Sequence, residues 1–78
     1  MNQIKTITQE LDGEKIAYCS ETLFTVDVGR YSKGKYKTKY SFKGNLGQAV
    51  FYYRCLNVGK GYKARLTMNG KVLRRKTS

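Results

Sequence analysis

Lysine and arginine are the residues of this sequence whose number and spacing favour a particular chemistry, the binding of an anion. The chain has 78 residues, with 16 Lys and Arg, 5 Asp and Glu, and a net charge of +11. All the acidic residues lie within the first 27 positions, and residues 28 to 78 contain no acid. Cations without partners repel one another and destabilise a compact state. We therefore expect a nucleic acid, an anionic membrane or an acidic protein surface as the partner.

The sequence offers few residues for catalysis. It contains no histidine, the usual base near neutral pH, and Cys19 and Cys55 form no C-x-x-C pair that would suggest a zinc site. A Ser or Cys nucleophile would need an activating base, and none is evident. The loop NVGKGYK does not match a phosphate-binding G-x-x-x-x-G-K-[ST] loop. We expect no enzyme, no cofactor and no metal; the enzymatic alternative is an RNA-cleaving toxin that uses Tyr, Lys and Arg.

The basic stretch GRYSKGKYKTKYSFKG, residues 29 to 44, is predicted to form a turn and the second strand of a pair. Before it, Phe24, Val26 and Val28 alternate with polar residues, as in a half-buried strand. Alternation in the second strand places these residues on the core side: Tyr36, Thr38, Tyr40 and Phe42. The other side receives a row of lysines about 6.6 Å apart, which comprises Lys35, Lys37, Lys39 and Lys43. This row is either a track for phosphates or ordinary protection of an edge strand.

A helix is predicted after this strand pair. One hairpin is predicted before the strand pair and another after the helix. Asn45 is the expected N-cap of the helix and Gly59 its expected C-terminal stop. Between them, apolar residues follow helical spacing: Leu46, Ala49, Val50, Tyr53 and Leu56. Asp12-Gly13 and Asn69-Gly70 each separate two short runs, which predicts two β-hairpins.

Together these segments predict a single small α+β domain over residues 1 to 78. The expected order is hairpin, strand pair, helix, hairpin, with the helix packed on a mostly antiparallel sheet. The strand–strand–helix part, residues 22 to 58, resembles the small sheet domains with which tyrosine recombinases grip DNA. That resemblance covers the arrangement of elements and no diagnostic motif.

The C-terminal hairpin predicts a second basic face. A two-residue Asn69-Gly70 loop pairs Arg65 with Arg74 and Lys63 with Lys76. Like charges directly opposite each other destabilise a sheet by on the order of 0.2–1 kcal/mol per pair. One explanation is that acids from the first third of the chain fold over this face. The other is that phosphates bind between the cations, with Arg in bidentate contact.

We expect a non-enzymatic nucleic-acid-binding protein, with DNA favoured over RNA, that contacts phosphates through a Lys/Arg-rich sheet face. The expected contact residues are Arg30, Lys33, Lys35, Lys37, Lys39, Lys43, Lys60, Lys63, Arg65, Arg74, Arg75 and Lys76. The alternative is a small inhibitor or adaptor that docks on an acidic surface of a larger nucleic-acid-processing protein. Its expected aromatic anchors are Phe51, Tyr52 and Tyr62.

Hydropathy and cysteine content predict the environment of the protein. The longest apolar or aromatic run, AVFYY, is too short for a signal peptide or a membrane span. We therefore expect a cytoplasmic protein, a monomer or homodimer, with no membrane partner. Cys19 and Cys55 are expected to be reduced and largely buried, although a disulfide between them is an alternative.

Overall fold

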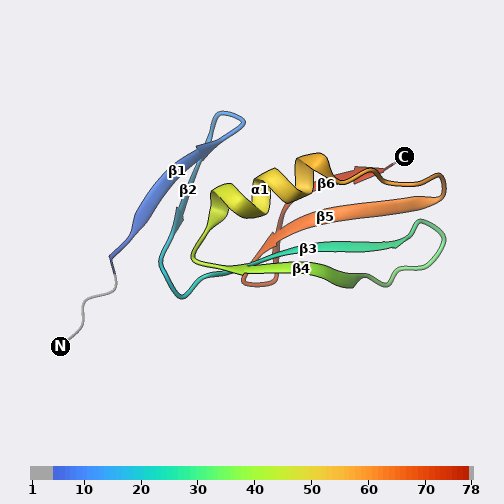
Figure 1. The fold of residues 1–78 in the computed structure, drawn as a ribbon, viewed down its shortest axis with the longest axis horizontal. Helices are drawn as coiled ribbons and strands as arrows, with labels where there is room; N and C mark the ends of the chain where they lie inside the picture. The colour runs from blue at the N-terminus through green and yellow to red at the C-terminus, as the bar shows by residue number, and fades with distance from the viewer. Residues whose placement is uncertain (1–4, 78) are drawn as a thin grey trace.

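The structure is a computed structural model and describes residues 5–77. This part of the chain contains six strands and one helix (Figure 1). Strands β1 (Ile7–Leu11) and β2 (Glu14–Tyr18) form an antiparallel hairpin. A second antiparallel sheet has the order β4-β3-β5-β6 and consists of β3 (Leu23–Arg30), β4 (Lys37–Lys43), β5 (Tyr62–Met68) and β6 (Lys71–Thr77). Helix α1 (Leu46–Cys55) connects β4 to β5. The predicted α+β fold and the order of its elements are confirmed.

Both hairpin turns adopt the backbone conformation that Asp-Gly and Asn-Gly favour. In the β1–β2 turn, φ is 49° at Asp12 and 83° at Gly13, and in the β5–β6 turn it is 48° at Asn69 and 85° at Gly70. Positive φ at both central residues defines a type I′ turn, whose twist matches that of the flanking strands. Both predicted hairpins are thus confirmed.

Helix α1 begins as predicted and ends earlier than predicted. The Asn45 side chain accepts a hydrogen bond from the backbone N–H of Gln48 at 3.0 Å, as an N-cap does. The chain leaves the helix at Leu56, which is extended, so Gly59 is not the C-terminal stop. At this end, the ammonium group of Lys76 donates hydrogen bonds to two carbonyl oxygens. A cation in this position offsets the partial negative charge of the helix C-terminus. Within residues 5–77, no helix has the length and hydrophobicity that crossing a membrane requires.

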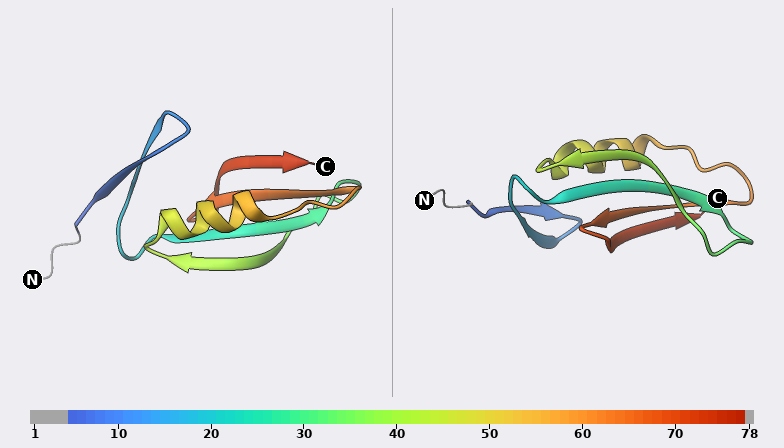
Figure 2. Two further views of the ribbon diagram at one scale, coloured as in Figure 1. Left: turned by 45° about the horizontal axis from the view of Figure 1, so that its top comes forward. Right: turned by 90° about the horizontal axis from the view of Figure 1, so that it is seen from below.

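The core lies between α1 and one face of the four-stranded sheet, which we call the helix face (Figure 2). Phe24 and Val26 of β3 and Leu66 of β5 are fully buried there. The N-terminal hairpin joins the same core, because the Tyr18 ring meets Phe24 edge-on with 5.1 Å between the ring centroids. The helix contributes the buried side chains of Leu46, Ala49 and Tyr53. The other face carries the odd-numbered residues of β3 and β5, and we call it the open face because no described helix covers it.

Two β-bulges change the alternation of the outer strands. Lys39 is the extra residue in β4, and Leu73 is the extra residue in β6. Side chains alternate between the two faces of a sheet, so one extra residue reverses the assignment of every position beyond it. Both basic strands therefore present a different set of cations to each face from the set that strict alternation predicts.

Candidate nucleic-acid interface

The bulge in β6 changes which of its cations lie on the open face. Arg74 and Lys76 lie on the helix face, and Arg75 takes the position opposite Arg65. The predicted pairs, Arg65 with Arg74 and Lys63 with Lys76, are therefore wrong by one residue. A like-charged pair still lies on the open face, but it is Arg65 with Arg75.

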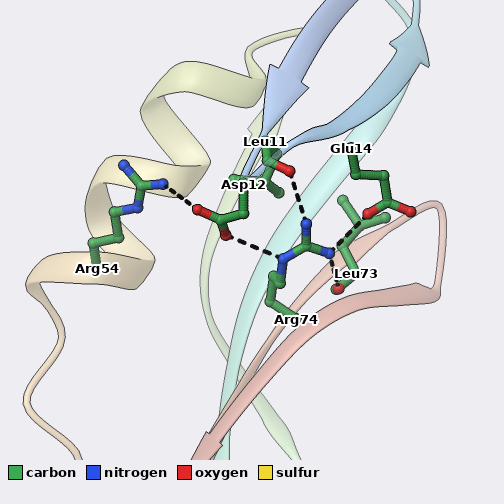
Figure 3. Close-up of polar contacts among 6 residues, drawn as sticks. All are labelled: Leu11, Asp12, Glu14, Arg54, Leu73 and Arg74. Carbon is green, nitrogen blue, oxygen red and sulfur yellow. Dashed lines mark hydrogen bonds and ion pairs between the residues drawn. The ribbon is translucent and has the colours of Figure 1, made fainter.

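Arg74 is bound by the turn of the N-terminal hairpin (Figure 3). Its guanidinium group donates from Nε to Asp12 Oδ2 at 3.2 Å, from Nη1 to Glu14 Oε1 at 2.9 Å and from Nη2 to the Leu11 carbonyl oxygen at 2.9 Å. Hydrogen bonding to Glu14 and Asp12 raises the pKa of Arg74 above its usual value. Arg54 of α1 binds the other oxygen of the Asp12 carboxylate at 3.0 Å. Both arginines are thus paired within the chain, and they join the hairpin turn to α1 and β6.

Asp27 plays a similar part on the open face. It is 4% exposed, and its Oδ2 accepts a hydrogen bond from Arg65 Nε at 2.8 Å. Its Oδ1 accepts a hydrogen bond from the Thr38 hydroxyl at 2.9 Å, so Thr38 lies on the open face and not in the predicted core. At the surface, Lys43 pairs with Glu21 at 2.9 Å. Of the two explanations for the basic faces, pairing with acids from the first third of the chain therefore applies to Lys43, Arg65 and Arg74. Partners within the protein bind these expected contact residues: Lys43, Arg65, Arg74 and Lys76.

The remaining expected contact residues form no ion pair with a described carboxylate: Arg30, Lys33, Lys35, Lys37, Lys39, Lys60, Lys63 and Arg75. They belong to the β3–β4 turn, the α1–β5 loop and the adjoining parts of β3, β4, β5 and β6, far from the N-terminal hairpin (Figure 1). We call this group the basic end. The backbone N–H of Tyr31 donates to the carbonyl oxygen of Gly61 at 2.8 Å, which joins the two loops. Most of the cations that have no acidic partner among the described residues are therefore gathered at this end, although Lys15 and Lys71, near the N-terminal hairpin, also form no ion pair.

The lysines of β4 do not form a row on one face. Lys43 lies on the open face opposite Leu23, whereas Lys37 pairs with Val28 on the helix face. The ammonium group of Lys39, the bulge residue, lies 5.7 Å from the centre of the Tyr40 ring. The even spacing expected of a regular strand is therefore absent, and Lys37 and Lys39 border the helix side of the sheet.

Gly29 allows the chain to cross β3 just before β4 begins. A Cβ atom at Gly29 would lie 2.2 Å from the carbonyl oxygen of Lys35, so only glycine permits this approach. The right view of Figure 2 shows the chain passing β3 before β4 begins. The contacts of the next residue, Tyr36, place its ring on the open face. Its ring centre lies 4.0 Å from Arg65 Cζ and 4.7 Å from Lys63 Nζ, within the range of cation–π attraction. The prediction that Tyr36 faces the helix is therefore wrong.

Two neighbouring grooves lie along the helix side of β4. The first, which we call the sheet groove, has a volume of about 340 Å³ and lies where the sheet extends past the end of α1; its lining includes Val28, Arg30, Lys37, Thr38, Lys39 and Tyr62. The second, the helix groove, has a volume of about 450 Å³ and lies between β4 and α1; its lining includes Lys39, Tyr40, Phe51, Tyr52, Cys55 and Leu56. Lys39 lines both grooves, so a ligand that occupied both would pass this side chain.

The aromatic residues expected as anchors differ in exposure. Phe51 is 63% exposed and Tyr62 is 39% exposed, whereas Tyr52 is half-buried against the Tyr40 ring at 4.9 Å. Tyr31, which sequence analysis did not single out, is 69% exposed. Nothing in its local pattern distinguishes it from any other turn residue, because its exposure depends on how the two loops meet.

The cysteines and the buried tyrosine complete the set of titratable groups. Cys19 and Cys55 are free thiols, and Cys55 is exposed, so the expectation of two largely buried thiols is wrong for Cys55. A hydrogen bond with the Thr22 hydroxyl lowers the pKa of the Cys19 thiol. Burial, the main cause, raises the pKa of Tyr53. In residues 5–77, no group of three or more His, Cys, Asp and Glu side chains could hold a metal ion.

Comparison of the chain with protein-family models, with curated proteins and with solved structures gave no match. What the protein binds is therefore inferred from the charges and grooves described above.

Proposed function

We propose that the protein binds nucleic acid without catalysing a reaction, with DNA favoured over RNA, and that the basic end contacts the phosphates. The observation that carries the proposal is that, within residues 5–77, the cations of the basic end have no carboxylate partner, while these acids elsewhere are paired: Asp12, Glu14, Glu21 and Asp27. Unpaired like charges that the fold gathers in one region favour binding of an external polyanion. Lysines supply point charges for phosphates, and Arg30 and Arg75 add bidentate donors.

Phosphate contacts make such binding steeply dependent on salt. Neutralising roughly five phosphates on duplex DNA makes log K fall with log salt with a slope near −4 to −5, and the same number on a single strand gives about −3.5. The proposal is tested by fluorescence anisotropy with labelled duplex DNA, single-stranded DNA and RNA at several salt concentrations. A flat response to salt would contradict it.

A pair of double variants locates the contact. Lys37→Gln with Lys39→Gln removes two charges of the basic end, and we expect affinity for every sequence to fall on the order of tenfold at low salt. Lys15→Gln with Lys71→Gln removes two charges from exposed positions near the N-terminal hairpin. This control should change affinity by less than about twofold. Equal losses in the two double variants would mean that net charge matters and the basic end does not.

A second candidate function is an inhibitor or adaptor that docks on an acidic surface of a nucleic-acid-processing protein. The exposed Phe51 ring on α1 supports it, because aromatic side chains in the centre of an interface often supply much of the binding energy. Charge would steer this association as well. Purified protein that carries no nucleic acid from low salt, and that shifts no labelled DNA or RNA, would favour this candidate over the first.

A further inference from the structure

We infer that the sheet groove and the helix groove together bind single-stranded nucleic acid, with unpaired bases against the aromatic rings and phosphates against Arg30, Lys37 and Lys39. The inference rests on the proposed function and specifies the form of nucleic acid that the same region takes. It follows from the residues that line each groove, from the lysine that both grooves share, and from the contacts that already engage Arg65 and Tyr36 on the open face.

The sheet groove combines an apolar floor with cations at its edges. Val28 lies on the floor, and Tyr62, on the neighbouring strand β5, forms one side. The guanidinium group of Arg30 lies 6.0 Å from the centre of the Tyr62 ring, and Lys37 lies opposite Val28 on the other side. A flat base can stack on a partly exposed tyrosine ring while the adjacent cations bind its phosphates.

The helix groove continues this arrangement on the other side of Lys39. The Tyr52 ring lies 4.9 Å from the Tyr40 ring and 5.8 Å from the Phe51 ring, as measured between centroids. Phe51 is the most exposed of these rings. The ammonium group of Lys39 stands over Tyr40, at the point where the two grooves meet. Aromatic surface, cation and aromatic surface thus follow one another, as base, phosphate and base do along a single strand.

Duplex nucleic acid does not suit these grooves. In a duplex the faces of the bases are stacked on one another, so a protein reaches only their edges and the backbone. The broad surface on which a duplex would lie is the open face, and there Asp27 already neutralises Arg65. The Tyr36 ring on that face contacts Arg65 and Lys63, and is not free for a base. Lys63 and Arg75 are unpaired cations of the open face, but no freely accessible ring accompanies them there. Accessible rings and unpaired cations occur together on the helix side, beside Arg30, Lys37 and Lys39, where unpaired bases fit.

The test compares three labelled probes of equal length by anisotropy at one low salt concentration. They are a single-stranded oligothymidylate, the same oligomer with abasic sites in place of all bases, and a duplex. We expect the abasic probe to bind at least roughly fivefold more weakly than the oligothymidylate, the effect of one stacked base, and the duplex to bind more weakly than the oligothymidylate. Equal affinity of the abasic and base-containing strands, or a preference for the duplex, overturns this inference and leaves the proposed function intact. If none of the three probes binds, both this inference and the proposed function are wrong.

Leucine variants assign the effect to the grooves. Tyr62→Leu keeps an apolar side chain and removes the ring. It should therefore lower the affinity for the oligothymidylate roughly fivefold or more and leave the affinity for the abasic probe unchanged. Tyr31→Leu is the matched control, because Tyr31 is exposed at the same end and lines neither groove. A loss with Tyr31→Leu as large as that with Tyr62→Leu overturns the assignment. A fold defect would weaken the abasic probe too, and Phe51→Leu in the helix groove then gives an independent measurement. If neither leucine variant in the grooves selectively weakens the base-containing probe, the inference is wrong.

Discussion

The Asp27 carboxylate lies 2.8 Å from Nε of Arg65 and forms the buried centre of the open face. The Asp27 side chain is 6% exposed and that of Arg65 is 31% exposed, so the acid is far more deeply placed than its partner. The Thr38 hydroxyl binds the second carboxylate oxygen. One acid thus connects β4, β3 and β5, and it removes a cation from the surface open to phosphates.

Replacing this acid should therefore destabilise the fold. Asp27→Asn leaves Arg65 half-buried without its charged acceptor, and we expect the free energy of unfolding to fall by about 1–3 kcal/mol. Urea denaturation measures it. Glu21→Gln is the control, since the Glu21–Lys43 pair is more than half exposed, and its loss should cost less than about 1 kcal/mol. Similar losses in both variants would show that burial of Asp27 adds nothing.

Gly29 should be the glycine of the β3–β4 region that tolerates substitution least. Gly29→Ala places a Cβ atom 2.2 Å from the Lys35 carbonyl oxygen, which forces the backbone crossing apart. We expect a loss of more than about 1 kcal/mol in stability, with weaker nucleic-acid binding because the β3–β4 turn moves. Gly34→Ala is the matched control, because a Cβ there meets no atom within 4 Å. It should be neutral or slightly stabilising, by up to about 1 kcal/mol. If the denaturant midpoints fall equally in both variants, the close approach of Gly29 to the Lys35 carbonyl oxygen is not what makes Gly29 necessary.

Two adjacent arginines of β6 should behave differently. Arg75→Gln removes an unpaired charge of the basic end, so we expect weaker nucleic-acid binding. Stability should not fall, and it should rise by up to about 1 kcal/mol because the like charge opposite Arg65 is gone. Arg74→Gln removes the contacts to Asp12 and Glu14, so it should loosen the N-terminal hairpin and hardly change affinity. Amide hydrogen exchange of β1 and β2 reports the loosening, and anisotropy reports the affinity. The opposite result, in which only Arg74→Gln loses affinity, would favour the strand register predicted from strict alternation, with Arg74 and not Arg75 opposite Arg65.

The Cys19 thiol should react at lower pH than an ordinary thiol. Because hydrogen bonding to Thr22 lowers its pKa in the folded state, the thiolate is favoured by folding. Its contribution to stability is therefore absent below the folded pKa and appears as pH rises through it. In a Cys55→Ser background, the alkylation rate of Cys19 should rise at lower pH than in urea-unfolded protein. Thr22→Val should move the rise to higher pH, and Thr22→Ser should not; identical profiles for the two would exclude the hydroxyl as the cause.

Local preferences in the sequence were sufficient to predict the elements of this fold. Asp12-Gly13 and Asn69-Gly70 specify their turns because the two residues of each pair accept positive φ. Asn45 specifies the start of α1 because its side chain binds an N–H only three residues away. The sequence alone also showed the excess of cations after residue 27, and this excess was the basis for expecting a polyanionic partner.

The side on which each basic residue lies depended on contacts between distant segments. A single extra residue reverses strand alternation, and whether Lys39 or Leu73 is extra follows from how β4 and β6 meet their neighbours. Charge pairing was also beyond local rules, because Coulomb attraction depends on distance in space and not on separation along the chain. Folding therefore brought Asp12 to Arg74 and left the basic end without an acidic partner among residues 5–77. That outcome converted a uniformly basic segment into one localised candidate site.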